Sequence, residues 1–117
     1  MKYDLEQRTS QFSENVIDFV KELSLDNVNT VLIKQIIRSS TSIGANYMEA
    51  DSGESRKDFS HKIAICRKEA KETCYWLKML MKTNPSRILE IRPLMKESRE
   101  LVLIFSRILI SSRSKEK

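Results

Sequence analysis

Glycine and proline are scarce in this sequence, with two of each among 117 residues. Tight turns between short strands depend on these two residue types, so a sheet protein of this length would need more of them. The scarcity therefore favours long helices joined by a few short connections. A chain of this length fits one domain around a single core, and we expect no second domain.

Apolar residues recur at helical spacing in four segments, which turn-forming residues separate from one another. Amphipathic helices with short connections predict an all-α fold, an antiparallel up-down four-helix bundle. Residues beyond the fourth segment form a polar tail that we expect to fray. The four predicted helices and the tail cover about residues 5–23, 30–50, 56–82, 86–112 and 113–117.

Capping and helix-breaking residues mark several of these boundaries. Gly53 is placed to end the second helix, and Ser55 is placed to cap the third. Pro93 falls inside the fourth segment, where a proline removes a helical hydrogen bond. We therefore expect a short helix followed by a longer one that starts near Arg92.

Two of the predicted helices carry more apolar residues than one core-facing stripe needs. The third has a second stripe, mixed apolar and acidic, made of Ile65, Trp76, Met79 and Leu80 with Asp58, Glu69 and Glu72. On the fourth, Leu103, Ile104 and Ile110 point away from the core stripe. Because monomers seldom expose such patches, we expect a homo-oligomer.

The outer side of the second helix is unusual because small and polar residues lie opposite its core stripe. Ser42 and Ala45 would let another helix approach closely, and Gly44 suggests a packing constraint. Arg38 and Glu49 could hydrogen-bond across such a contact, or they could be ordinary solvated charges. We predict a polar network that fixes helix packing or subunit register, made of Arg38, Ser42, Asn46, Glu49, Glu69, Glu72 and Trp76.

Reactive residues are few, and none forms a recognisable catalytic or metal-binding pattern. His61 is the single histidine, and it lies on a different side of its helix from Cys66. Cys66 and Cys74 lie on the apolar stripe, where buried reduced thiols are the expectation, and no secretory leader is apparent. Asp58 is the one acid three residues before the histidine, which is too little for a metal site. We expect no enzyme activity, no cofactor and no metal.

The formal net charge of +5 favours acidic partners, including nucleic acid. Repetition of the basic residues around an oligomer would give a field strong enough for salt-dependent phosphate binding, although a solvated basic surface is the alternative. No recognition motif accompanies the charge. The candidate nucleic-acid contacts are Lys62, Arg67, Lys68, Lys71, Lys78, Arg107 and Arg113.

Two consecutive stretches, "QIIRSSTSIGANYMEA" and "SRKDFSHKIAICRKEAKETCYWLKML", resemble the bacterial 23S rRNA intervening-sequence proteins. The accessory protein of diversity-generating retroelements belongs to the same broad group. The shared pattern is an Arg-Ser, a Ser-Ile, an Asn and a Glu-Ala on the second helix, then Lys-Asp-Phe and Trp-Leu on the third. These elements stand here at Arg38-Ser39, Ser42-Ile43, Asn46, Glu49-Ala50, Lys57-Asp58-Phe59 and Trp76-Leu77.

The resemblance implies a four-helix bundle assembled as a ring-like homopentamer in a bacterial cytoplasm, with no family catalytic residues. Two functions follow as alternatives. One is an oligomer that associates with RNA or DNA through its basic surfaces. The other is a protein-interaction scaffold for a neighbour-encoded partner, such as a reverse transcriptase, without direct nucleic-acid binding. No membrane association is expected, because no apolar run reaches the length of a membrane span.

Overall fold

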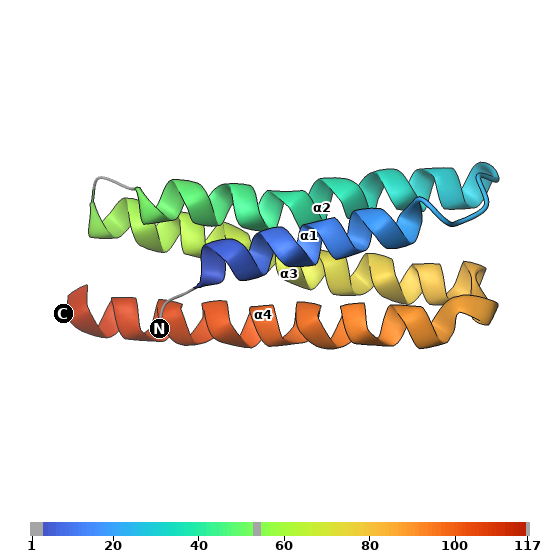
Figure 1. Ribbon diagram of the computed structural model, residues 1–117. Coiled ribbons are helices and arrows are strands. Elements are labelled where there is room, and N and C mark those ends of the chain that lie inside the picture. The colour runs from blue at the N-terminus through green and yellow to red at the C-terminus, as the bar shows by residue number, and fades with distance from the viewer. Residues whose placement is uncertain (1–3, 53–54, 117) are drawn as a thin grey trace.

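The computed structural model describes residues 4–52 and 55–116, with side chains to Ser112, and this part of the chain contains helices and no strand. Figure 1 shows a rod of four long helices that measures 49 × 21 × 20 Å. A short 3-10 helix, η1, precedes the last of them. The elements are α1 (Leu5–Val20), α2 (Asn27–Asp51), α3 (Arg56–Thr83), η1 (Pro85–Arg87) and α4 (Ile88–Glu116).

Successive helices run in opposite directions, and their connections alternate between the two ends of the rod (Figure 1). Each helix packs on the next one in the chain, and α4 closes the bundle against α1. The predicted up-down four-helix bundle is therefore confirmed. The start of α1 and the end of α4 lie at the same end of the rod.

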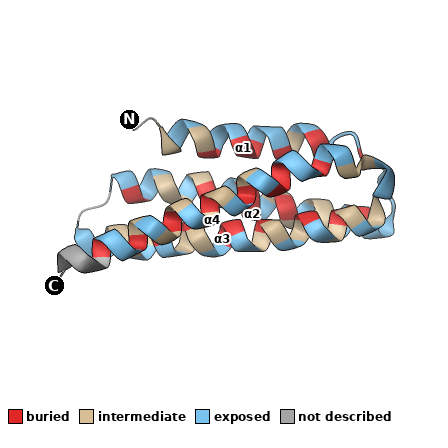
Figure 2. Ribbon diagram, turned by 90° about the horizontal axis from the view of Figure 1, so that it is seen from below, coloured by how far each residue is buried: buried red, intermediate tan, exposed pale blue. Residues whose placement is uncertain are grey.

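Buried residues follow the inward-facing stripe of every helix (Figure 2). Large apolar side chains fill the centre, and removing their surface from water is the main favourable contribution to folding. Those with no exposed surface include Val16, Ile36, Ile43, Ile63, Leu77, Leu80, Ile91, Leu101 and Phe105.

Small residues bring neighbouring helices close together. A Cβ atom placed on Gly44 of α2 would lie 3.3 Å from Thr9 Oγ1 of α1, so Gly44 has the packing role that its position suggests. Ser13 donates a hydrogen bond to the carbonyl of Ser40, which links α1 to α2 at 2.9 Å. These contacts satisfy buried hydroxyls while the backbones approach each other.

The structure places several helix ends differently from the sequence prediction. The second helix begins at Asn27, because Asp26 caps it by accepting hydrogen bonds from the N–H groups of Val28 and Asn29. Ser55 caps α3 as predicted, whereas Gly53 lies outside the described residues. The last helix continues to Glu116, past the predicted end at residue 112, and the first ends at residue 20 rather than 23.

Pro93 does not divide the fourth segment as predicted, since α4 is continuous from Ile88. The chain instead turns at η1, just after Asn84. Pro93 lies in the second turn of α4, where it removes only the hydrogen bond to the carbonyl of Leu89. Leu89 is exposed, so solvent can reach that end of the helix and the loss is small.

Candidate nucleic-acid interface

A row of ion pairs within one chain crosses the contact between α2 and α3, and we use the name paired groove for this row, which consists of Arg38, Glu49, Lys62, Glu69 and Glu72. Arg38 Nη1 of α2 lies 3.2 Å from Glu69 Oε1 of α3, and Arg38 Nη2 bonds Glu72. Further along, Lys62 of α3 pairs with Glu49 of α2. The pKa of Arg38 is raised, chiefly by its hydrogen bond to Glu72. The structure thus joins three of the predicted network residues, Arg38, Glu69 and Glu72, within one chain, and it pairs a fourth, Glu49, with Lys62.

Ser42 and Asn46 of the predicted network form a separate contact on α2. Asn46 Nδ2 donates to both the carbonyl and the hydroxyl of Ser42, each at 2.9 Å. No hydrogen bond in the described part of the chain connects this pair to Arg38. Ser42 and Asn46 therefore bond to each other and are not part of the row of ion pairs.

Trp76 lies half-buried beside the paired groove and packs against the core. Its indole nitrogen is buried and has no hydrogen-bond partner among the described residues. Its ring meets the exposed ring of Tyr75 edge-on, with centroids 5.1 Å apart and planes at 72°. Trp76 therefore has one side in the core and the other against Tyr75.

The second apolar stripes are partly core residues. Leu80 has no exposed surface, and Ile104 is half-buried against the core, so both were wrongly assigned to an outer surface. The buried arc of each helix is wider than one stripe because each long helix packs on two neighbours. Leu103 and Ile110 are 56% and 64% exposed, and their outward placement is confirmed.

The predicted phosphate contacts divide into side chains that are engaged within the chain and side chains that are exposed. Lys62 is paired with Glu49, and Arg67 Nε donates to Ser106 Oγ at 2.8 Å, so both are engaged within the chain. Four other predicted contacts, Lys68, Lys71, Lys78 and Arg107, are exposed. The side chain of Arg113 lies outside those that the structure describes.

A second groove, of about 900 Å³, runs between α3 and α4, and we call it the basic groove. Cys74, Met81 and Met95 contribute apolar surface to it, and Tyr75 and Leu103 also line it. Four cations stand along it, and none makes an ion pair in the described part of the chain. They are Lys78 of α3 and Arg92, Lys96 and Arg99 of α4.

Sequence reasoning missed the three cations of α4. Arg92, Lys96 and Arg99 follow one another at intervals of four and three residues, which places them on one side of a helix. That spacing was readable in the sequence. Their position opposite Lys78 was not, because it depends on how α4 packs on α3.

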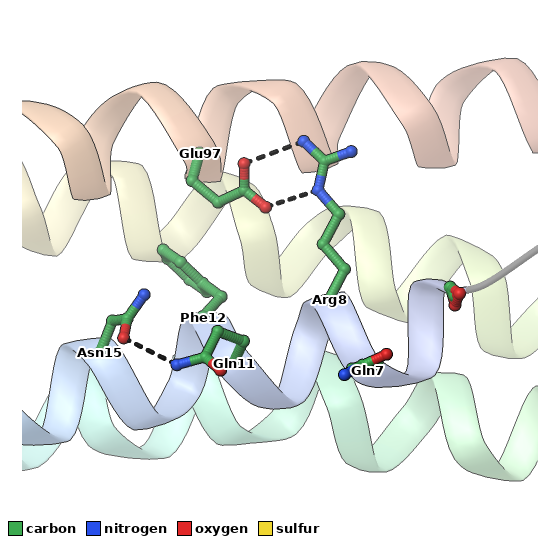
Figure 3. A pocket seen from close by; sticks show the side chains of 7 residues that line it. Gln7, Arg8, Gln11, Phe12, Asn15 and Glu97 are labelled. Carbon is green, nitrogen blue, oxygen red and sulfur yellow. Dashed lines mark hydrogen bonds and ion pairs between the residues drawn. The ribbon is translucent and has the colours of Figure 1, made fainter.

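Glu100 is the one acid in the basic groove, and Arg8 of α1 holds it. Arg8 Nη2 lies 2.7 Å from Glu100 Oε1, while Nε and Nη2 donate to the two carboxylate oxygens of Glu97 at 2.6 and 2.9 Å. Figure 3 shows the bidentate contact between Arg8 and Glu97 beside the cleft between α1 and α4. These bonds raise the pKa of Arg8, with the hydrogen bond to Glu97 as the largest cause. The Glu100 charge is thus neutralised from outside the groove.

Charge is divided unequally among the four helices. Eight Lys or Arg stand against three Asp or Glu in α3, and six against four in α4. The numbers are one against three in α1 and two against two in α2. The basic groove therefore lies between the two helices that carry the positive charge of the chain.

Reactive side chains are placed apart from one another. Cys66 is fully buried, its thiol donates to the carbonyl of Ile43, and burial raises its pKa to about 12. His61 is exposed on α3. Within residues 4–52 and 55–116, no group of three or more His, Cys, Asp or Glu side chains could hold a metal ion. None of the described helices combines the length and apolar character that crossing a membrane requires.

Comparison with known proteins places this geometry in a family. The sequence model described as "23S rRNA-intervening sequence protein" matches residues 1–107. The chain belongs to this family. The family prediction made from the two sequence stretches is confirmed.

A crystal structure from Bacteroides thetaiotaomicron VPI-5482 has the same fold as this 23S rRNA-intervening sequence protein. It is described as a protein with unknown function from the S23 ribosomal protein family. It is 34% identical, with a TM-score of 0.82, and the match covers 91% of this chain and 98% of that chain. A comparison with curated proteins found no match.

Three of the residues that carry the family resemblance, Arg38, Ser39 and Glu49, bond across the contact between α2 and α3. Ser39 Oγ and Thr73 Oγ1 share a hydrogen bond of 2.8 Å between α2 and α3, directly beside Arg38 and its acidic partners. The resemblance therefore describes how α2 and α3 are joined. Three cations of the basic groove, Arg92, Lys96 and Arg99, lie outside the two quoted stretches. The fourth, Lys78, lies within the second stretch.

Proposed function

We propose that this protein is a non-enzymatic homo-oligomer, a pentameric ring in a bacterial cytoplasm, that associates with nucleic acid through its basic groove. The observation that carries the proposal is the row of four unpaired cations, Lys78, Arg92, Lys96 and Arg99, in one groove. A cation already held by a carboxylate gains little from a phosphate, because one ion pair replaces another. Unpaired cations instead release the counterions of the nucleic acid on binding.

The contrast between the two grooves supports different roles for them. The paired groove holds two cations and three carboxylates, all in ion pairs. Helical spacing places apolar Ile65, Trp76 and Met79 on the Glu69 side of α3, and the small residue Ala45 on the Arg38 side of α2. Subunit interfaces combine such apolar surface with satisfied polar groups. We propose that subunits meet there, which would leave the basic groove open to solvent. Five copies would then present about twenty unpaired cations, a field far above that of one chain.

Light scattering behind a sizing column tests both parts of the proposal. Protein is run alone and with a short RNA, at low and at high salt. The expected mass is close to five times the 13.7 kDa of one chain, with an increase on RNA binding that high salt reverses.

The matched variants each remove two positive charges, and they remove them from different parts of the molecule. Replacing Lys78 and Arg99 by Ala should weaken RNA retention, whereas replacing Lys21 and Lys34 by Ala removes the same charge from exposed positions that do not line the basic groove. RNA retention that salt does not alter, or no retention at all, would overturn the nucleic-acid function. A monomeric mass would overturn the ring, and salt-insensitive capture of one protein would favour a scaffold.

A further inference from the structure

The basic groove has features that a simple basic surface lacks. Tyr75 is 52% exposed and stands at the groove, which also has apolar surface from Cys74, Met81 and Met95. An exposed aromatic ring beside unpaired cations is the arrangement by which proteins hold single-stranded nucleic acid. The ring stacks on a base, and the cations follow the phosphates.

The Tyr75 ring is held in place for such a contact. Its neighbour Trp76 packs against the core and meets Tyr75 edge-on at 5.1 Å. Edge-to-face pairs are a favoured geometry, so the tyrosine is supported from the side. About half of the Tyr75 surface is exposed, and this exposed part is available to another flat ring. Lys78, three residues on, stands beside it on the same side of α3.

The cations of α4 extend the groove along the helix axis. Arg92 and Arg99 are seven residues apart, which is about 10 Å along a helix, with Lys96 between them. This line can follow consecutive phosphates of one strand. Glu100 also lines the groove, and Arg8 pairs with it, so the one acid among the described lining residues is already neutralised.

We propose that the basic groove binds a single-stranded segment of nucleic acid, with one base stacked on Tyr75 and its phosphates on Arg92, Lys96 and Arg99. The inference rests on the proposed function and names the ligand class of that same site. A duplex offers phosphates but keeps its bases stacked inside, so it cannot use the tyrosine or the apolar surface. Single strands should therefore bind more tightly than duplexes of the same sequence.

Fluorescence anisotropy with a labelled RNA of about 12 nucleotides tests this, since single-strand sites span such lengths. The same RNA annealed to its complement is the second probe, and an acidic peptide of equal charge is the third. Tyr75→Ala should weaken single-strand binding on the order of tenfold, with Tyr75→Phe close to wild type because a phenyl ring still stacks. Neither change should alter duplex binding.

The triple variant Arg92→Ala/Lys96→Ala/Arg99→Ala tests the phosphate contacts. Its plot of log affinity against log salt should be shallower by about two, because each lost contact to a single strand removes roughly 0.7 from the slope. Lys21→Ala/Lys34→Ala is the control, and melting curves confirm that each variant folds.

The outcomes separate this inference from the proposed function. Salt-dependent RNA binding that ignores Tyr75, or that favours the duplex, would overturn the single-strand site and leave the function in place. Binding of the acidic peptide as tight as that of RNA would also overturn it. A wild-type protein that binds none of the nucleic-acid probes would overturn both.

Discussion

The two grooves beside α3 use charge in opposite ways. In the paired groove, Arg38 and Lys62 each have a carboxylate partner across the helix contact. In the basic groove, Lys78 and the three cations of α4 have none in the described part of the chain. On α3, Glu69 and Glu72 thus lie on the side of the paired groove, and the side that faces the basic groove is positive.

This difference separates the charges that join helices from those available to a ligand. Charge counts alone do not make the distinction, because Lys62, Arg67 and Lys78 are alike in sequence. Geometry does, since Lys62 is paired with Glu49, Arg67 bonds Ser106, and Lys78 has no ion pair among the residues that the structure describes. Net charge therefore indicates the class of partner that we propose, and the cations without an ion pair indicate the surface that would bind it.

Leu77→Ala should remove the difference between the grooves altogether. Leu77 is fully buried on α3, so truncation leaves a cavity and destabilises the bundle by about 2–5 kcal/mol. Because α3 forms one wall of both grooves, subunit assembly and RNA retention should fall together. Chemical denaturation measures the loss, and Leu89→Ala, at a 78% exposed leucine, should change stability by less than about 0.5 kcal/mol. Similar effects of the two changes would contradict the assigned core.

Arg38→Ala should affect the paired groove alone. Glu69 is buried and would lose its partner, but Arg38 itself is half-exposed, so we expect a loss of about 1–2 kcal/mol. Assembly should weaken while the affinity for RNA per chain stays unchanged. Lys34→Ala is the control, because Lys34 is an exposed cation of α2 without an ion pair in the described residues. Wild-type melting and wild-type mass for Arg38→Ala would show that the pair has no structural role.

Arg8→Ala should lower both stability and RNA affinity, because it releases the carboxylate of Glu100 in the basic groove. Without Arg8, Glu100 would be free to neutralise a cation of the basic groove, and α1 would lose its bonds to α4. We expect a fall in stability of about 1 kcal/mol, since the pair is partly exposed, and severalfold weaker RNA binding. The double variant Arg8→Ala/Glu100→Gln should recover RNA affinity without recovering stability. Full affinity in the single variant would exclude a role for Arg8 in the groove.

The two cysteines offer the smallest perturbation, because one lines the basic groove and the other is buried in the core. Cys74 lines the basic groove, whereas Cys66 is buried and its pKa is raised to about 12. At pH 8 the Cys66 thiol stays protonated, so a thiol reagent should label Cys74 first, and bound RNA should slow that labelling. Mass spectrometry after a short pulse identifies the labelled residue. Equal labelling of both thiols would contradict the difference in burial.

The bundle could be predicted from sequence because its signals are local. Apolar spacing gave the helices, and Ser55 marked the start of α3. Predictions failed where the answer depends on neighbours in space. Pro93 is tolerated because the hydrogen bond that it removes is to the carbonyl of Leu89, in the first turn of α4. Leu80 is buried because α3 packs on two helices.

The candidate site was only partly predictable for the same reason. The residues of the paired groove were recognised as a network, yet the choice of Glu49 for Lys62 required the structure. The α4 cations had a readable spacing, but nothing in the sequence placed them beside Lys78 and Tyr75. A groove is formed by two helices, whereas a sequence pattern predicts the faces of one helix at a time, so the pattern does not show which residues share a groove.

The bridge from Arg8 to Glu97 spans 89 residues of sequence, whereas most helix contacts join neighbours in the chain. During synthesis, α1 and α2 can pair long before α4 leaves the ribosome, but the bundle cannot close until its last helix is available. The order of events is thereby built into the topology. Contacts between consecutive helices need only part of the chain, whereas the Arg8 bridge that neutralises Glu100 needs both the first and the last helix, so the basic groove can reach its full charge only when the whole chain is present.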